Sequence, residues 1–211
     1  MVHPDHPAPT DLLIVFVRHY QAGRVKTRLI KRFGAQGALS LYKQLVAHTF
    51  AAAAHFPGDV RVLMDAEDHE ISRGAVANGW QTGLQSSGDL GQRMVNAMKQ
   101  GLQHYHRVLL VGSDCPVLSL DYFNKALNAL SEHPVIFGPS RDGGYVLIGG
   151  SQLNDWHVGR FDEVRLGTPC ALEDSIAAFA PHQVFLLSPL WDVDEPQDVF
   201  HAVENGLLVI P

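Results

Sequence analysis

The chain has 211 residues, of which 46% are hydrophobic and 18% are charged, and its formal net charge at pH 7 is −6. A chain of this length and composition can bury a sizeable core in one domain, which excludes a disordered protein apart from an N-terminal tail over residues 1–10. The acidic balance argues against a nucleic-acid partner, because such proteins need a basic face.

Cysteine content and hydropathy bear on the cellular location. The two cysteines, Cys115 and Cys170, cannot form a disulfide framework, which is typical of a reducing compartment. No apolar run approaches the roughly 18 residues that a membrane helix needs, and the N-terminus lacks the features of a signal peptide. We therefore expect a cytoplasmic protein without a membrane partner.

Apolar runs alternate with segments of helical periodicity along the chain. The predicted strands cover residues 12–17, 60–64, 80–84, 107–111, 135–137, 145–148 and 184–187. The predicted helices cover residues 35–55, 67–77, 89–104, 119–131, 168–179 and 196–204. This alternation predicts an α/β fold over residues 11–211, as a single domain with a mostly parallel, Rossmann-like sheet and helices on both faces. We interpret the less regular segment 138–170 as an insertion that builds the substrate side of a cleft.

A cluster of cations follows the first strand. The run 12–17 is entirely apolar and suits a strand buried on both faces of a parallel sheet. The next eleven residues contain four cations, namely Arg18, Arg24, Lys26 and Arg28. Ligands of such sheets bind beyond the carboxyl ends of the strands, so this loop predicts an anion site, with phosphate as the common candidate. A solvated basic loop is the alternative.

Two of these cations carry the phosphate prediction. The loop is not a Walker A loop, because Val25 stands where that motif requires a glycine. Lys26 and Arg28 flank Thr27, so in an extended loop both side chains would point to one side and bracket a polyphosphate. Gly23 would let the backbone approach the ligand closely. Ion pairs with acidic residues elsewhere are the alternative for both cations.

Two acidic segments could hold a divalent metal. Asp114 follows the predicted strand 107–111, and a carboxylate at that end of a central strand faces the ligand crevice. Asp192 and Asp194 alternate with Val193, so they share one side of an extended segment. Mg²⁺ (or Mn²⁺) takes one or two carboxylates together with substrate phosphates, which favours Asp114 and Asp194 as ligands, with Asp192 beside them. Helix or turn capping is the alternative at both segments.

Two glycine-rich segments complete the candidate site. Residues 87–93 open a helix whose N-terminal amides could meet an anion or the polar edge of a base, and capping of that helix by Asp89 is the alternative. Residues 141–145 include Gly143 and Gly144, and a tight hairpin turn before a strand is enough to account for both glycines. The twelve histidines show no zinc-site spacing, so no zinc site is expected.

Six sequence blocks occur in a fixed order. They are Phe16-Val17-Arg18 with Gly23-Arg24-Val25-Lys26-Thr27-Arg28-Leu29, Gly88-Asp89-Leu90-Gly91-Gln92-Arg93-Met94, Gly112-Ser113-Asp114-Cys115-Pro116, Gly138-Pro139 with Asp142-Gly143-Gly144-Tyr145, Gly167-Thr168, and Asp192-Val193-Asp194 with Pro196 and Asp198. Together they resemble a bacterial family of GT-A-like transferases, described as glycosyltransferase-like or nucleotide-diphospho-sugar transferase-like, of the type associated with selenium and radical-SAM enzymes. A more distant similarity extends to the guanylyltransferases of phospholactate and molybdenum-cofactor synthesis.

The resemblance implies a Rossmann-like GT-A sheet with a nucleotide over the carboxyl ends of its first strands. The implied nucleotide-binding residues are Arg18, Gly23, Lys26, Arg28, Gln85, Gly88, Asp89, Gly91 and Arg93. The implied substrate-binding residues are Asp142, Gly143, Gly144, Tyr145 and Thr168. Lys26, Arg28 and Asp114 would be catalytic, and the metal would be shared by Asp114, Asp192 and Asp194.

The chain departs from the family pattern at four positions. Tyr20 and Ala22 stand where the family has prolines, so the loop lacks the fixed φ that proline imposes. Leu166 stands in place of a tryptophan, and Glu195 stands in place of a threonine. These departures bear on the preorganisation of the loop and on recognition of the acceptor.

Three functions follow as hypotheses. The first is a Mg²⁺-dependent transferase that binds a nucleoside triphosphate or nucleotide-sugar and a small-molecule acceptor; in its nucleotidyl version the acceptor attacks the α-phosphorus and pyrophosphate leaves. The second is a glycosyltransferase that uses a nucleotide-sugar donor in the same cleft. The third is a non-catalytic, nucleotide-binding regulatory protein. The basic loop favours the first, since a triphosphate presents more charge, and the sequence leaves a homodimer open.

Overall fold

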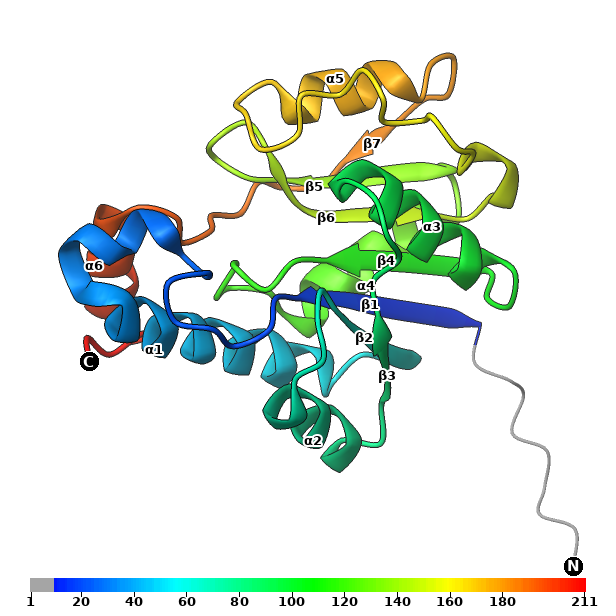
Figure 1. The fold of residues 1–211 in the computed structure, drawn as a ribbon. Helices are drawn as coiled ribbons and strands as arrows, with labels where there is room; N and C mark the ends of the chain where they lie inside the picture. Colours follow the sequence, from blue (N-terminus) through cyan, green and yellow to red (C-terminus); the bar gives the residue numbers. More distant parts are fainter. Residues whose placement is uncertain (1–9) are drawn as a thin grey trace, which may run out of the picture.

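Strand β1 (Asp11–Val17) lies between β2 and β4 in a seven-stranded sheet of the computed structural model, which describes residues 10–211 (Figure 1). All seven residues of β1 are buried, including the six of the apolar run 12–17, as that run predicts. The other strands are β2 (Asp59–Met64), β3 (Gln81–Leu84), β4 (Arg107–Val111), β5 (Val135–Pro139), β6 (Tyr145–Gly150) and β7 (Phe185–Leu186). The tail predicted over residues 1–10 lies outside the described residues except for Thr10.

The sheet is mostly parallel, as predicted, and its strand order is β3-β2-β1-β4-β6-β5-β7. β1 pairs in parallel with β2 and β4, β2 with β3, and β5 with β7. The reversed strand is β6, which is antiparallel to β4 and β5 because a short hairpin over residues 140–144 joins it to β5. The carboxyl ends of the other strands and the amino end of β6 therefore meet along one edge.

Helices cover both faces of the sheet. They are α1 (Thr27–Ala53), α2 (His69–Ala77), α3 (Leu90–Leu102), α4 (Leu120–Ala129), α5 (Ala171–Ala178) and α6 (Pro196–Glu204), with a short 3-10 helix η1 (Leu153–Asp155). α1, α2 and α4 pack on the face that carries Leu13 and Val15, whereas α3 and α5 pack on the face that carries Leu12 and Ile14. Figure 1 shows α3 in front of the sheet and α4 behind it. Across residues 10–211, no helix is both long and apolar enough to cross a membrane.

A third hydrophobic cluster joins α6 to α1. Leu29, Leu41 and Leu45 of α1 pack with Val193 and Val199. Figure 1 shows α6 beside the first turns of α1, although the two helices are far apart in the sequence. This packing brings the segment that precedes α6 to the start of α1, at the carboxyl edge of the sheet.

Helix α1 begins at Thr27 and is interrupted at Gly34, so the predicted helix 35–55 corresponds to the part after this kink, and the part before it was not predicted. Gly34 has φ 72° and ψ 167° and kinks the helix, and the regular apolar pattern begins only after this kink. Lys26 precedes the helix in a left-handed conformation with φ 44° and ψ 50°, and Arg28 already lies in the first turn. The extended geometry predicted for Lys26 and Arg28 is therefore wrong, because the helix begins between them.

The remaining predicted elements are present with shifted ends. α5 is shorter than the predicted span 168–179, because residues 168–170 form a turn in which Ala171 N–H donates to the Thr168 carbonyl over 3.0 Å. β7 is shorter than the predicted strand 184–187 and has only two residues. Helix ends are set by caps and turns rather than by apolar periodicity, so the pattern alone places them loosely.

An ion pair at the amino ends of β1 and β4 gives a test of the sheet. Arg107 donates from Nε to Asp11 Oδ1 over 2.6 Å and from Nη2 to Asp11 Oδ2 over 2.7 Å, and the Asp11 side chain is 9% exposed. Asp11→Asn removes the charge of this paired geometry and is expected to lower the free energy of unfolding by about 2 kcal/mol. Urea denaturation followed by circular dichroism measures the change.

The control for this variant is Asp121→Asn. Asp121 forms an exposed pair with Lys125 one turn along α4, over 2.8 Å, and its loss is expected to change the unfolding free energy by less than about 0.5 kcal/mol. Equal effects of the two substitutions would contradict the role given to the Asp11–Arg107 pair.

Candidate functional site

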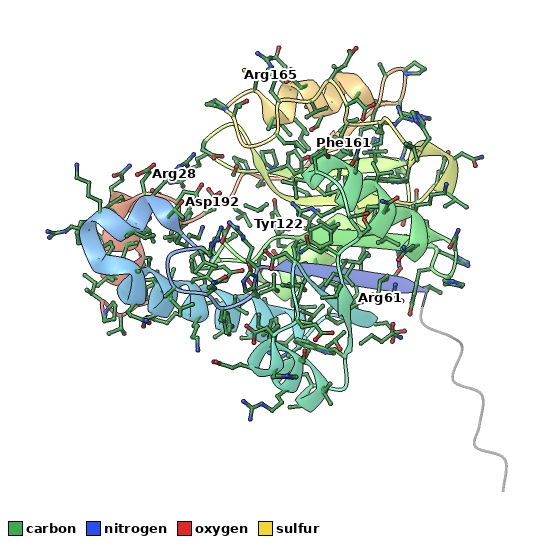
Figure 2. All side chains as sticks on the ribbon, viewed as in Figure 1. Arg28, Arg61, Tyr122, Phe161, Arg165 and Asp192 are labelled. Atoms are coloured by element: carbon green, nitrogen blue, oxygen red, sulfur yellow. The ribbon has the colours of Figure 1, made fainter. Side chains whose placement is uncertain are left out.

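A cleft of about 630 Å³ opens along the edge of the sheet where β1 and β4 end. Its walls come from the loops after β1 and β4, the β5–β6 hairpin, the first turn of α3 and the segment before α6. The predicted site residues that line it are Arg18, Lys26, Arg28, Gln85, Arg93, Asp114, Asp142, Gly144, Tyr145, Asp192 and Asp194. Figure 2 shows Arg28 and Asp192 on the same side of the molecule, well away from Arg61.

Lys26 stands between two carboxylates that are distant in the sequence. Its Nζ lies 2.8 Å from Asp114 Oδ1 and 2.8 Å from Asp194 Oδ1, and its side chain is only 6% exposed. Burial alone would lower the pKa of Lys26, but the charges of Asp114 and Asp194 outweigh it and raise the pKa above the ordinary value. The buried amine is therefore charged and links the loop after β1 to two other parts of the chain.

The backbone of Lys26 is strained. Among the described residues, Lys26 is the one non-glycine residue with a positive φ. A left-handed conformation costs a residue with a side chain about 1 kcal/mol, so the surrounding contacts must hold it there. The two ion pairs of Nζ provide such contacts.

Arg28 reaches the same carboxylate from the first turn of α1. Its Nη1 lies 3.2 Å from Asp194 Oδ2 and its Nε lies 3.6 Å from Glu195 Oε1. The Arg28 side chain remains 58% exposed at the rim of the cleft. The structure thus shows for Lys26 and Arg28 the ion pairs that the sequence left as an alternative, and both residues line the cleft.

A group of three carboxylates lies in the same cleft. Asp142, Asp192 and Asp194 each offer one oxygen, and these oxygens lie within 4.8 Å of one another. Val193 is fully buried and turns its neighbours Asp192 and Asp194 into the cleft, as the alternation predicts. Burial, followed by the charges of Asp142 and Asp194, raises the pKa of Asp192 to about 7. Sequence reasoning missed Asp142 as a member of this group, because the hairpin that carries it meets Asp192 only in the folded sheet.

Backbone and hydroxyl contacts fix the loops around Asp114. Val193 N–H donates to the Asp114 carbonyl over 3.0 Å. Tyr42 of α1 is buried, and its hydroxyl lies 2.9 Å from Ser113 Oγ while accepting a 2.8 Å hydrogen bond from Arg18 N–H. Tyr42 therefore ties the loop after β1 to the loop after β4, a role for which its helical position gave no signal.

The loop after β1 is also held by the residues that follow β2. His19 N–H donates to Asp65 Oδ1 over 2.7 Å, and Tyr20 N–H donates to Asp68 Oδ2 over 2.7 Å. A proline in place of Tyr20 would have no N–H to donate. In this chain the Asp65 and Asp68 carboxylates hold the backbone of the loop through these hydrogen bonds, whereas a proline would restrict the loop through its fixed φ. Sequence reasoning missed Asp65, although it directly follows the strand that ends at Met64, the same signal that selected Asp114.

Gln85 and Arg93 face the cleft beside the ends of β1 and β2. Gln85 Nε2 donates to the Leu63 carbonyl over 3.0 Å, and Arg93 Nη1 donates to Gln85 Oε1 over 2.7 Å. These bonds fix the orientation of the Gln85 amide. Gln85 and Arg93 are among the residues that the resemblance places near a nucleotide, and these hydrogen bonds give both side chains defined positions in the cleft.

Six predicted site residues do not line the cleft, namely Gly23, Gly88, Asp89, Gly91, Gly143 and Thr168. Asp89 caps α3: it accepts from Gln92 N–H over 2.9 Å, and its own N–H donates to Gln92 Oε1 over 3.2 Å. This is the capping alternative at the helix N-terminus that was predicted to meet an anion, and it takes up the N–H of Gln92. Thr168 Oγ1 donates to the Arg165 carbonyl over 2.7 Å within an exposed turn.

The glycines of this set shape the walls of the cleft. Gly23 has φ 83° and Gly143 has φ 90°, so both turns require a residue without a side chain. A Cβ on Gly91 would lie 2.7 Å from Phe161 Cβ, so this glycine lets α3 pack closely on the segment that contains Phe161. Gly23, Gly91 and Gly143 therefore support the walls through turn geometry and packing, although they do not line the cleft themselves.

Comparison with known proteins identifies relatives of the chain. The family described as "Uncharacterized protein conserved in bacteria (DUF2064)" matches residues 47–168. A solved structure from Desulfovibrio desulfuricans G20, described as a "putative nucleotide-diphospho-sugar transferase", is 30% identical with a TM-score of 0.76, over 89% of this chain and 83% of that chain. None of the curated proteins compared with the chain matches it.

Two further solved structures share the fold at lower identity. CMP:2-keto-3-deoxy-manno-octonic acid synthetase complexed with CTP is 12% identical with a TM-score of 0.59, over 94% of this chain and 100% of that chain. Rv0371c from Mycobacterium tuberculosis H37Rv, in complex with manganese, is 14% identical with a TM-score of 0.56, over 92% and 98% of the two chains. Together with the D. desulfuricans structure, these likenesses confirm the predicted Rossmann-like α/β fold.

The repulsion among the three carboxylates predicts an effect of Asp192→Asn on stability. In the unfolded chain Asp192 ionises near pH 4, whereas burial and the charges of Asp142 and Asp194 raise its pKa in the folded protein to about 7. Between these values the folded protein binds a proton that the unfolded chain has lost, so stability falls as the pH rises through this window. Without metal, Asp192→Asn is therefore expected to raise the free energy of unfolding at pH 8 by about 1 kcal/mol, after allowance for solvent screening.

Urea denaturation in EDTA at pH 8 and at pH 4 measures this effect. The advantage of the variant is expected at pH 8 and is expected to be almost lost at pH 4, where the carboxyl is protonated in the folded protein and about half protonated in the unfolded chain. A variant that is less stable than the wild-type protein at pH 8 would contradict the repulsion.

Proposed function

The chain belongs to the bacterial family DUF2064, and on that premise we propose that it is a metal-dependent transferase that moves a nucleotidyl group from a nucleoside triphosphate to a small-molecule acceptor. Its likeness to the D. desulfuricans protein supports the class of transferase. The observation that carries the proposal is the convergence, in one cleft at the carboxyl edge of the sheet, of the buried Lys26 ammonium and the carboxylates of Asp142, Asp192 and Asp194.

The cations of the loop after β1 would bind the phosphates. Arg28 is largely exposed at the rim, and Arg18 lines the cleft from the same loop. Lys26 is charged and held in place, so it needs no reorganisation when negative charge develops nearby. Preorganised donors of this kind stabilise a transition state by about 3 kcal/mol each.

The proposed reaction is an in-line displacement. An oxygen of the acceptor forms a bond to the α-phosphorus, the bond from that phosphorus to the bridging oxygen breaks, and pyrophosphate leaves with the electron pair. The proton of the acceptor hydroxyl passes to solvent at the open cleft. The protein's share of this chemistry is positioning and charge stabilisation, which Lys26 and Arg28 supply.

The carboxylates fit a divalent metal. Three oxygens within 4.8 Å, one of them on a carboxyl whose pKa is raised by burial and by its neighbours, form a donor set that Mg²⁺ or Mn²⁺ prefers. Asp142, Asp192 and Asp194 would hold the ion. We keep Asp114, which the sequence predicted as a ligand, as a further proposed ligand of the metal. When bound, the ion would supply positive charge to phosphate oxygens. The manganese complex of a protein with the same fold supports this assignment.

Gln85 and Arg93 would lie along the nucleoside. Their mutual hydrogen bond fixes the Gln85 amide, and Gln85 also donates to the carbonyl groups of Leu63 and Val17 at the ends of β2 and β1. Both Nε2 hydrogens are then in use, and the fixed Oε1 has a second lone pair that can accept a hydrogen bond from a base edge without a loss of rotamer entropy. The CTP complex of a protein with the same fold supports a nucleotide over these strands.

Glycosyl transfer from a nucleotide-sugar is the second candidate. The description of the D. desulfuricans relative as a nucleotide-diphospho-sugar transferase favours it, and the same cleft would serve. Thermal-shift measurements with Mg²⁺ and each of ATP, CTP, GTP and UTP, followed by the corresponding nucleotide-sugars, separate the two. Stabilisation by nucleotide-sugars without stabilisation by any triphosphate would reverse the order of the candidates.

Arg28→Gln is expected to weaken binding of the stabilising triphosphate about tenfold. The substitution removes a charge-assisted hydrogen bond to phosphate, which contributes about 1.5 kcal/mol, and Arg28 is exposed enough for the protein to fold without it. Isothermal titration calorimetry in Mg²⁺ measures the dissociation constant. Arg32→Gln is the matched control, because Arg32 is an exposed arginine one turn further along α1 and does not line the cleft. A similar loss of affinity in both variants would contradict the role of Arg28.

Removal of divalent metal is expected to abolish stabilisation by the triphosphate. In EDTA the three carboxylates repel the phosphates, and the thermal shift is expected to return when Mg²⁺ or Mn²⁺ is added. Asp194→Asn is expected to lose this response, whereas Asp162→Asn, at an exposed position outside the cleft, keeps it. A thermal shift of the same size in EDTA and in Mg²⁺ would contradict the metal site.

A further inference from the structure

The cleft has two chemically different halves. Its polar half contains the loop after β1 and the carboxylates described above. Its other half, here called the apolar half, is lined by Phe16, Leu90, Met94, Leu110, Ile148 and Leu166. The proposed binding of phosphates and metal uses the polar half, and the proposed nucleoside site at Gln85 and Arg93 lies at the border between the two halves.

The floor of the apolar half is built by the sheet. Leu110 of β4 and Ile148 of β6 are register partners on neighbouring strands, and Phe16 lies at the carboxyl end of β1 on the same face. All three are nearly buried, so their positions are fixed by the core. A ligand group over them would lie on a rigid apolar surface.

The wall of the apolar half comes from α3 and from the segment before α5. Leu90 and Met94 are four residues apart and therefore project from one side of the first turns of α3. Gly91 lies between them, where a Cβ would come within 3.4 Å of Leu166 Cδ1. α3 and the segment with Leu166 are thus packed closely together, so the wall is a defined part of the structure.

Leu90 remains in contact with water. It is the first residue of α3, and its side chain is 40% exposed although it borders the cleft. Covering such a side chain with an apolar ligand removes it from water and favours binding. The exposed leucine therefore marks the mouth of the apolar half as a place for an apolar group.

Charge distinguishes this half from the polar one. Among the described residues, α3 and the segment 151–170 contribute one charged side chain to the cleft, Arg93. Arg93 already donates to Gln85 Oε1 over 2.7 Å and to the Asp89 carbonyl over 3.3 Å. Arg93 therefore lies at the border with Gln85, and a charged ligand group over Phe16, Leu110 and Ile148 would lose its water against an apolar surface, which is costly.

Resting on the proposed function, we propose that the apolar half holds the acceptor, and that the acceptor is an uncharged molecule with a hydroxyl group on an apolar or aromatic body. The body would lie on Phe16, Leu110 and Ile148, between Leu90 and Leu166. The hydroxyl group would face the polar half, where the nucleotide is bound. This chemistry distinguishes the acceptor from a sugar phosphate or another anionic acceptor.

The test uses two probes in the presence of Mg²⁺ and the triphosphate that gives the largest thermal shift. 4-Phenyl-1-butanol is uncharged and carries one hydroxyl on an aromatic body, whereas glycerol 3-phosphate carries hydroxyls and a charge. Calorimetric titration is expected to show binding of the alcohol by the wild-type protein, tighter than that of glycerol 3-phosphate. With the polar half filled by nucleotide, the two probes report on the apolar half.

Leu90→Ser and Leu166→Ser are each expected to weaken binding of the alcohol about fivefold, with the thermal shift by nucleotide unchanged. The matched control is Leu120→Ser: Leu120 is the first residue of α4, 39% exposed and outside the cleft, and its variant is expected to bind the alcohol as the wild-type protein does. The melting temperature of each variant without ligand identifies any loss of folding.

The outcomes separate this proposal from the proposed function. A nucleotide shift in the wild-type protein without binding of the alcohol, or with tighter binding of glycerol 3-phosphate, overturns the acceptor proposal alone. Loss of the nucleotide shift in Leu90→Ser and Leu166→Ser, with both variants folded, would make the apolar half a base pocket and also overturns it. Absence of any nucleotide shift in the wild-type protein refutes the proposed function, and the acceptor role fails with it.

Discussion

The ammonium group of Lys26 between Asp114 and Asp194 is the contact on which the site depends. It is nearly buried, yet it is charged, because two carboxylates at 2.8 Å offset the cost of removing it from water. The three residues come from the loop after β1, the loop after β4 and the segment before α6. One contact therefore sets the positions of three loops, and it holds Lys26 in a conformation that the backbone by itself disfavours.

Around this contact the sheet separates two kinds of surface. On the side of α1 and α6, ion pairs and hydroxyl groups join the loops, and the Tyr42 hydroxyl bonds to both Arg18 N–H and Ser113 Oγ. On the side of α3, apolar side chains of the core continue to the edge of the sheet and remain open at Leu90. Such a division suits a transferase, in which a charged donor and a differently built acceptor must lie side by side.

The sequence predicted the fold well because its strands are apolar runs and its helices are periodic. It missed the helical residues 27–33 of α1, because Gly34 separates them from the periodic part of the helix, and so it gave the wrong geometry for Arg28. In the site, the position of Asp114 after a central strand predicted its place in the cleft, and the same rule applied to Asp65 would have found that residue. The pairing of Asp142 with Asp192 was beyond such rules, since no local pattern relates a hairpin to a segment fifty residues later.

The sequence by itself determined the α/β architecture, the basic loop after β1 and the alternation that turns Asp192 and Asp194 to one side of Val193. These features depend on local periodicity and on the rule that ligands bind at the carboxyl ends of strands. Only the tertiary structure decided which charges meet, because the packing of α6 on α1 brings Asp194 to Lys26 across more than 160 residues of chain. Distances between side chains on separate elements are set by packing, and a linear pattern contains no information about them.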